Sequence, residues 1–218
     1  MKIALLKHLS NLGYESLLDS ANRCICVDSP DLIIGPDYGL SLPMLETHQK
    51  NSRQDVLGSV QELSRAHPSV RLILGSMSWQ DGDKMLHSSP SYTGGELQNE
   101  FFKKRSNGEA DMARASGLQF VGGDSSLNQF NFGNKRFSYE ICGDHGHQDV
   151  SGVDVELISA YDTNFGFYVN ATNDHWDRIV LGTDGLSGRL LAQKFEVGNG
   201  IKNIPMEENE RRGVYTLK

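Results

Sequence analysis

Over the first third of the chain, short continuous apolar runs alternate with segments in which apolar residues recur at helical spacing. Continuous apolar segments at Lys2–His8 and Asp31–Gly35 are typical of buried strands, and a third strand is predicted at Val70–Ser78. Between them, apolar residues recur at helical spacing in Tyr14–Val27 and in Asn51–Ala66, which predicts two helices. Alternating strands and helices of this length indicate an α/β domain.

The rest of the chain is richer in strands. Lys84–Ser91 and Gly95–Lys103 predict an antiparallel pair around a Gly94-Gly95 turn, and Asp111–Ser116 predicts a helical turn. Further strands are predicted at Leu118–Val121, Val153–Ala160, Phe165–Val169, Arg178–Leu181 and Arg189–Phe195. The polar tail at 201–218 is predicted to be a surface arm. Because no repeat, low-complexity tract or linker interrupts the pattern, residues 1–218 are predicted to form a single domain.

Composition narrows the classes of function. The 218 residues are 38% hydrophobic and 22% charged with a formal net charge of -7, which is typical of a soluble globular protein and disfavours nucleic acid as a partner. The apolar run at the N-terminus is too short for a signal peptide, and no apolar run is long enough to cross a membrane. The 3 cysteines do not make a disulfide framework. We therefore expect a cytoplasmic protein that acts on small molecules or proteins.

The strongest candidate for chemistry is a cysteine at the end of a predicted strand. In Lys135–Asp144, aromatic and β-branched residues alternate with other residues up to Cys142, and Gly143 opens a turn. A thiol held at a strand end suits a nucleophile, which needs a nearby base or cation to form its thiolate. The alternative is a packing role, because free cysteines are among the most buried residues.

Short motifs accompany this cysteine in a fixed order. They are Asp-Leu-Ile-Ile-Gly-Pro-Asp ending at Asp37, Leu-Gly-Ser-Met-Ser-Trp ending at Trp79, Phe-Phe-Lys-Lys ending at Lys104, Gly-Glu ending at Glu109, and Phe-Ser-Tyr-Glu-Ile-Cys-Gly-Asp ending at Asp144. In this order the chain resembles the nitrilase superfamily of carbon–nitrogen hydrolases. The resemblance implies a four-layer αββα sandwich with a Glu-Lys-Cys triad. It also implies a small amide substrate, a homodimer, and no organic cofactor or metal.

The resemblance assigns a role to each matching residue. Cys142 stands in the place of the nucleophile, and Gly143 would supply a backbone N–H to the oxyanion. Lys104 fits the aromatic-x-Lys pattern best, with Lys103 as the alternative if the register shifts by one residue. Glu109 resembles the second glutamate, which helps to position the lysine and the substrate.

Two departures from the family pattern bear on function. Asp37 stands where the family has its general-base glutamate, and a side chain shorter by one methylene withdraws the carboxylate by roughly an ångström. The segment after Cys142 also lacks the proline and the arginine-rich continuation of the family. These departures support a second interpretation, in which a nitrilase-like fold with an impaired base serves as a binding or regulatory protein.

A third interpretation is a metal-dependent hydrolase. His145, His147 and Asp149 resemble the His-x-His-x-Asp part of metallo-β-lactamase-type hydrolases, and imidazole and carboxylate groups can converge on zinc. The next residue is not a second histidine, so a polar turn is the simpler explanation. Glu140 lies two positions before Cys142, and strand alternation predicts that the two share a face. Glu140 is therefore a less favoured substitute for the base.

Overall fold

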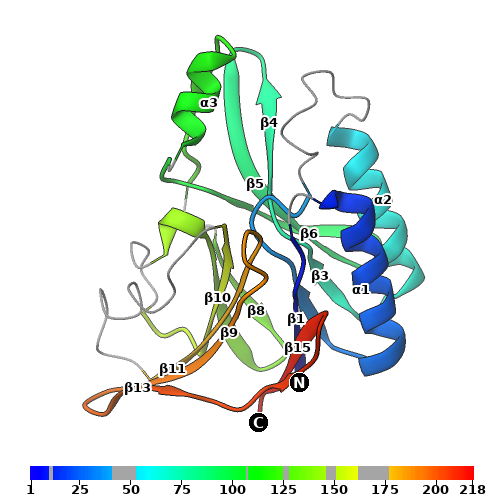
Figure 1. Ribbon diagram of the computed structural model, residues 1–218, viewed down its shortest axis with the longest axis vertical. Helices are drawn as coiled ribbons and strands as arrows, with labels where there is room; N and C mark the ends of the chain where they lie inside the picture. Colours follow the sequence, from blue (N-terminus) through cyan, green and yellow to red (C-terminus); the bar gives the residue numbers. More distant parts are fainter. Residues whose placement is uncertain (10–11, 41–52, 107, 125–127, 146–150, 162–176) are drawn as a thin grey trace.

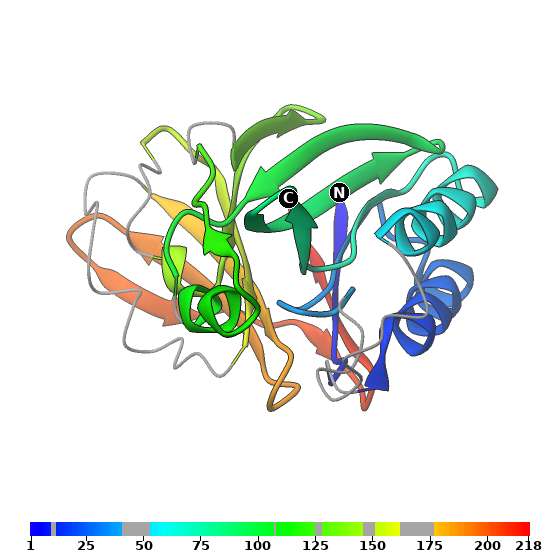
Figure 2. The same ribbon diagram turned by 90° about the horizontal axis from the view of Figure 1, so that it is seen from above.

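The computed structural model describes residues 1–9, 12–40, 53–106, 108–124, 128–145, 151–161 and 177–218. They form two β-sheets packed against each other, with a pair of helices on the far side of the first sheet (Figure 1; Figure 2). An apolar core separates the two sheets, and fully buried side chains such as Leu5, Ile34, Phe101 and Leu157 come from both of them. The described residues thus form helix, sheet and sheet layers of the predicted αββα sandwich.

The first sheet has the strand order β14-β15-β1-β2-β3-β5-β4 in the described part of the chain, with β6 and β7 also paired to β5. Its strands are β1 Lys2–Leu6, β2 Leu32–Ile34, β3 Arg71–Ile73, β4 Met77–Asp81, β5 Lys84–Thr93, β6 Glu96–Phe102, β7 Gln119–Phe120, β14 Glu207–Glu208 and β15 Arg212–Thr216. β1, β2 and β3 run parallel, because a helix follows each of the first two strands and returns the chain to the end of the sheet at which that strand began. The antiparallel pair β5 and β6 confirms the predicted hairpin.

The second sheet has the strand order β13-β12-β11-β10-β9-β8. Its strands are β8 Gln129–Phe132, β9 Lys135–Ile141, β10 Val155–Ala160, β11 Arg178–Asp184, β12 Leu190–Glu196 and β13 Gly200–Asn203. The central strands β9, β10 and β11 are parallel, so their carboxyl ends lie at one edge of the sheet. The strand predicted at Phe165–Val169 lies outside the described residues.

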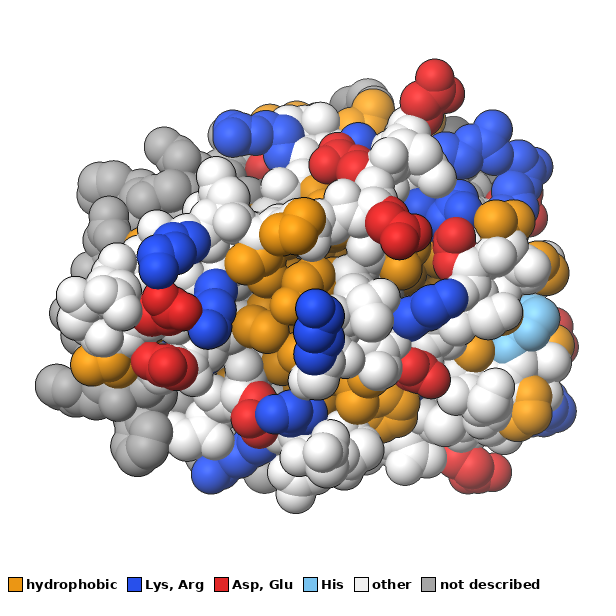
Figure 3. Space-filling model, turned by 90° about the horizontal axis from the view of Figure 1, so that it is seen from below, with side chains coloured by type: hydrophobic (Ala, Val, Ile, Leu, Met, Phe, Trp, Pro, Cys, Tyr) orange, Lys and Arg blue, Asp and Glu red, His pale blue; other side chains and the backbone are white. Residues whose placement is uncertain are grey.

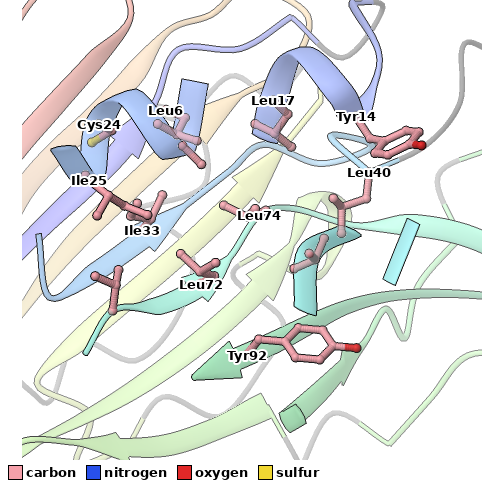
Figure 4. Packing of buried hydrophobic residues seen from close by; sticks show 14 of the residues in the cluster. Leu6, Tyr14, Leu17, Cys24, Ile25, Ile33, Leu40, Leu72, Leu74 and Tyr92 are labelled. Carbon is pink, nitrogen blue, oxygen red and sulfur yellow. The ribbon is translucent and has the colours of Figure 1, made fainter. Parts of the chain in front are cut away.

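Helices α1 (Tyr14–Asp28) and α2 (Arg53–Ala66) pack on the outer face of the first sheet. Leu17, Ala21 and Cys24 lie at helical spacing on the buried face of α1 and belong to the core between α1 and the sheet. Figure 4 shows Leu17 and Cys24 in this packing. The third helix, α3 (Glu109–Ala115), lies against β5 and β7. None of these described helices is long and apolar enough to span a membrane.

The prediction of a surface arm at 201–218 is wrong. β15 pairs antiparallel with β1 along its whole length, from Lys2 opposite Thr216 to Leu6 opposite Arg212. Val214 in this strand is only 8% exposed. Charged residues precede β15 and make this part of the sequence look polar. Pairing with β1 nevertheless buries the apolar positions of β15 in the sheet.

A cavity of about 590 Å³ lies beside β15, and its lining includes Ile179, Met206, Val214 and Leu217. Hydrophobic side chains gather in the middle of the face that Figure 3 shows from below. The lining of this cavity includes none of the residues that the sequence predicts for the site. Asp37, Lys104 and Cys142, which the sequence predicts for the site, instead follow the ends of strands.

Candidate active site

Asp37 lies just beyond β2, where two backbone segments cross. Gly75 has a φ of 98°, a conformation that favours glycine, and a Cβ at this position would collide with the backbone oxygen of Pro36. The close crossing brings Ser76 to Asp37, and the Ser76 hydroxyl donates a hydrogen bond to Asp37 Oδ1. Asp37 is completely buried at this crossing.

The Asp37 carboxylate is held on both sides. Oδ1 also accepts hydrogen bonds from the Tyr38 backbone N–H at 3.0 Å and from His87 Nε2 at 2.8 Å, while Oδ2 lies 3.8 Å from Lys103 Nζ. Burial raises the pKa of Asp37, but the charges of His87 and Lys103 and the hydrogen bonds from His87 and Ser76 lower it below its ordinary value. The carboxylate is therefore ionised at neutral pH.

Lys103 is the lysine that meets this carboxylate. It follows β6, its backbone N–H continues the ladder to His87 O at 2.9 Å, and it shares the inward face with Phe101 because side chains alternate along a strand. Lys103 is 1% exposed, whereas Lys104 points to solvent. The structure thus places the alternative residue, Lys103, beside Asp37, and not Lys104, which the sequence favoured.

Glu109 joins the same group from the first turn of α3. Its Oε1 accepts a hydrogen bond from Lys103 Nζ and another from the Tyr38 hydroxyl at 2.7 Å. Burial lowers the pKa of Lys103, but the charges of Asp37, Cys142 and Glu109 raise it more, so that Lys103 stays protonated. We call the group of buried charged residues the front cluster: Asp37, His87, Lys103 and Glu109.

Cys142 stands directly after β9, at the point where the chain leaves the second sheet. It begins a turn of 3-10 helix, Cys142–Asp144, and has a φ of 47°, which is uncommon for a residue other than glycine. The thiol is 8% exposed, and its Sγ lies 3.4 Å from Tyr161 O. The Asp37 backbone N–H donates to Ala160 O at 3.2 Å. Because Tyr161 is the next residue, Cys142 lies beside the front cluster.

Asp144 connects the cysteine turn to the lysine segment. Its two carboxylate oxygens accept hydrogen bonds from the backbone N–H groups of Lys104 and Arg105, each at 2.7 Å. These bonds join two segments that follow strands of different sheets. Gly143, the predicted oxyanion donor, lies between Cys142 and Asp144 in this turn and is half-buried.

A chain of hydroxyl groups joins the two sheets beneath the site. Ser89 Oγ donates to Gly75 O at 2.6 Å and lies 3.0 Å from the Tyr139 hydroxyl. The Tyr139 hydroxyl lies 2.5 Å from Ser159 Oγ, which donates to Gly35 O at 2.5 Å. All of these side chains are fully buried, so the bonds hold β2, β5, β9 and β10 in one relative position. The carboxyl ends that carry Asp37 and Cys142 are fixed accordingly.

No protein-family model matches the sequence, and no curated protein sequence matches it. Among solved structures, an amidase from Nesterenkonia sp. AN1 superposes with a TM-score of 0.66 at 16% identity, over 100% of this chain and 93% of that chain. A CN-hydrolase superfamily protein from Xanthomonas campestris superposes with a TM-score of 0.65 at 12% identity, over 100% of this chain and 90% of that one. The structure has the nitrilase superfamily fold.

The nitrilase fold is also found in part of a larger enzyme. A glutamine-dependent NAD⁺ synthetase from Cytophaga hutchinsonii superposes with a TM-score of 0.63 at 10% identity, over 94% of this chain and 42% of that chain. The comparisons confirm the predicted fold class. In one structure of the Nesterenkonia amidase, acrylamide has added to the active-site cysteine by Michael addition.

Behind the turn that carries Cys142 lies a second buried group of charges, on the outer face of the second sheet. His145 Nδ1 lies 2.7 Å from Glu140 Oε2 and 2.9 Å from Glu156 Oε1, and Arg178 Nε donates to Glu156 Oε2 at 2.8 Å. We call these four residues the rear cluster. The prediction that Glu140 shares a face with Cys142 is wrong, because Cys142 leaves the strand and Glu140 points to the rear.

The rear cluster bears on the metal hypothesis. Glu140, His145 and Glu156 offer ligand atoms that lie within 4.8 Å of one another. Burial lowers the pKa of His145, but hydrogen bonds to both glutamates and their charges raise it to about 9. A metal ion at these atoms would have to displace the proton of His145, and in its absence His145 and Arg178 together balance the two carboxylates. His147 and Asp149, the other predicted ligands, lie outside the described residues.

Several residues of the site escape sequence reasoning. Ser76 and His87 contact Asp37 through their side chains, and the Asp144 side chain contacts the backbone of Lys104, yet each is a common residue type in a turn or strand. Only the hairpin register carries a signal for His87, because alternation in β5 places it on the same face as Ser89. Tyr38 has a φ of 57° and an edge-to-face contact with His87 at 4.7 Å, which no sequence pattern indicates.

Proposed function

We propose that the protein is a carbon–nitrogen hydrolase of the amidase type, with Cys142 as nucleophile, Lys103 as the cation and Asp37 as the general base. One observation supports this most: Asp37, Lys103 and Glu109 converge in a buried group beside a cysteine held at a strand end. Cysteine nucleophiles need a base and a cation within reach, and the front cluster supplies both. The assignment differs from the sequence prediction in the lysine alone.

The first half of the reaction forms a thioester. Asp37 accepts the proton of the Cys142 thiol, and the sulfur attacks the amide carbonyl carbon. Lys103 and the Gly143 N–H stabilise the negative charge that develops on the carbonyl oxygen. Asp37 then donates the proton to the leaving nitrogen, the carbon–nitrogen bond breaks, and an amine or ammonia leaves.

The second half of the reaction hydrolyses the thioester. Asp37 accepts a proton from a water molecule, and the hydroxide attacks the carbonyl carbon of the acyl group. The carbon–sulfur bond breaks, the carboxylic acid leaves, and the proton on Asp37 returns to the sulfur. Glu109 holds Lys103 in place throughout and, with Asp37, contributes the negative charge that keeps Lys103 protonated.

The test compares the wild type with Cys142→Ala on a panel of small aliphatic and aromatic amides, with ammonia release as the measure of turnover. We expect release from at least one amide by the wild type and a loss of at least about a thousandfold in Cys142→Ala, because the nucleophile is absent. Intact-mass spectrometry of the wild type should show an acyl adduct on Cys142.

The matched control is Cys24→Ala, which removes the other buried thiol, on α1. Its activity should stay close to that of the wild type. Turnover that survives in Cys142→Ala would contradict the thiol mechanism. A wild type that forms no adduct and hydrolyses no amide would instead favour a binding or regulatory protein with an impaired base.

A further inference from the structure

His87 is a buried histidine whose two ring nitrogens are both engaged by polar side chains. Nε2 lies 2.8 Å from Asp37 Oδ1 and 2.7 Å from Ser76 Oγ, and Nδ1 lies 2.7 Å from Ser78 Oγ. The ring is 0% exposed, and the edge-to-face contact with Tyr38 closes another side. The side chain therefore has one orientation, with Nε2 toward the carboxylate.

This orientation bears on the shortened base. An aspartate in the place of a glutamate has a carboxylate that reaches less far, and an error of about 1 Å in a catalytic group can lower the rate about a hundredfold. In this chain the donors from Tyr38, Ser76 and His87 all converge on Oδ1. Oδ2 then lies on the side of Lys103, at 3.8 Å from its Nζ.

We propose that His87 is the positioning residue of the general base: by holding Oδ1 of Asp37 it directs Oδ2 toward the reaction centre and makes the shorter carboxylate competent. The inference rests on the proposed function. It extends that function because it makes the activity of Asp37 depend on a residue outside the triad. His87 acts through Asp37 and does not itself contact the reacting atoms.

The charges that surround Asp37 set the expected effect of pH. Lys103 and His87 contact it directly, and Glu109 and the Tyr38 hydroxyl lie across Lys103. The donor from His87 is one of the causes that hold the pKa of Asp37 below its ordinary value. Without this donor the pKa of Asp37 rises, so the acid limb of the pH profile should move to higher pH.

Two amide variants separate the effect of the Nε2 donor from that of a lost ring. His87→Gln places an amide nitrogen close to the position of Nε2 and keeps the donor to Asp37. His87→Asn is one methylene shorter and reaches Ser78 on the Nδ1 side but not Asp37. Asp37→Asn serves as the reference for a missing base, and the thermal unfolding midpoint checks the fold of every variant.

The probe is p-nitrophenyl acetate, whose good leaving group acylates an activated thiol without help from a general acid. The burst of p-nitrophenolate then reports acylation of Cys142, and the steady rate reports hydrolysis of the thioester, which needs the base. Peptide mapping locates the acetyl group, and the exposed Cys26 is the internal reference for an ordinary thiol.

We expect a burst in the wild type and in His87→Gln, and a slower burst in His87→Asn because Asp37 also accepts the thiol proton. In His87→Asn the steady kcat should fall about a hundredfold, with an acetyl group that persists on Cys142 and an acid limb at higher pH. His87→Gln should recover most of this loss. A purely structural role for His87 would lower the unfolding midpoint without moving the acid limb.

Failure of the inference and failure of the proposed function give different results. Two results would overturn the role of His87 alone, provided that the wild type shows a burst. One is a steady rate in His87→Asn equal to that of the wild type, and the other is an equal loss of rate in His87→Gln and His87→Asn. If Cys142 of the wild type is acetylated no faster than Cys26, the proposed function is overturned, and this inference with it. If His87→Asn does not fold, Ser76→Ala replaces it, because it removes another donor from the same Oδ1.

Discussion

The front and rear clusters contain the same kinds of groups in different arrangements. Each has two carboxylates, one histidine and one lysine or arginine, and all eight side chains are buried. In the front cluster the histidine contacts one carboxylate and the lysine lies near both. In the rear cluster the histidine contacts both carboxylates and the arginine contacts Glu156.

Position in the fold explains why we assign chemistry to one cluster and support to the other. Asp37 and Lys103 follow the carboxyl ends of β2 and β6, beside the cysteine, whereas Glu140 and Glu156 lie within strands of the second sheet. The rear cluster holds His145, three residues after Cys142, and so fixes the turn that carries the thiol. Composition alone does not distinguish a reactive site from a support, but position at the ends of strands does.

The largest effect that should distinguish the front cluster from the rear cluster is a loss of turnover on substitution of Lys103. We expect Lys103→Gln to lower turnover of an amide or of p-nitrophenyl acetate by about a hundredfold to a thousandfold, because the group that stabilises the oxyanion is lost. Lys104→Gln is the matched control, and its rate should stay within about twofold of the wild type because Lys104 points to solvent. Steady-state rates of both variants check this.

The reverse result, with activity lost in Lys104→Gln and kept in Lys103→Gln, would contradict the assignment of the lysine. The unfolding midpoint of Lys103→Gln has to be measured as well, because two buried carboxylates lose a charged partner. A variant that is folded and inactive supports a role in the reaction.

Much of the fold follows from the sequence because local patterns determine it. The helix predicted at Tyr14–Val27 is found at Tyr14–Asp28, and the hairpin around Gly94-Gly95 is found as β5 and β6. Apolar spacing and turn glycines decide these elements without help from distant residues. The predicted arm at 201–218 failed because burial of β15 depends on β1, which lies at the other end of the chain.

The candidate site was predictable in its main residues but not in its geometry. Strand alternation from Phe101 would have selected Lys103 over Lys104, had the inward face of β6 been known. The alternation of side chains along the strand gave a wrong prediction that Glu140 and Cys142 share a face, because the left-handed conformation of Cys142 ends the regular strand at Ile141. Contacts made across the two sheets, such as those of His87 and Asp144, depend on how loops meet in space and leave no local pattern.

A smaller effect is expected from breaking the rear cluster. Glu156→Gln removes the carboxylate that His145 and Arg178 both contact, and we expect the free energy of unfolding to fall by about 3 kcal/mol. Because the front cluster is untouched, the folded fraction of the variant should still form an acyl adduct on Cys142. Urea denaturation at neutral pH measures the loss, and intact-mass spectrometry measures the adduct.

The matched control for Glu156→Gln is Asp111→Asn, another change from acid to amide in an ion pair. Asp111 and Arg114 are 80% and 78% exposed, so their pair should contribute less than about 1 kcal/mol. Equal losses of stability in the two variants would show that the rear cluster is no more important than a surface pair. Loss of the acyl adduct by folded Glu156→Gln would show that the two clusters are coupled.

The smallest effect concerns the pH dependence of stability, in which the rear cluster should dominate. Contacts with Glu140 and Glu156 raise the pKa of His145 from 6.5 to about 9 in the folded protein. The folded state therefore binds this proton more tightly than the unfolded chain does. The stabilisation is complete below pH 6.5 and is lost as the pH rises through 9.

The loss should amount to roughly 2 kcal/mol between about pH 6 and pH 10, because part of the ideal linkage energy is offset when the neighbouring groups rearrange. In His145→Gln the chain should be less stable at pH 6 but should lose less stability over this range, since the proton of His145 is then absent. Glu156, whose pKa burial raises but His145 and Arg178 lower further, limits stability on the acid side instead. Urea midpoints of both proteins across this range measure the difference. Parallel curves for the wild type and His145→Gln would mean that His145 does not carry the proton, and would reopen the question of a metal at Glu140, His145 and Glu156.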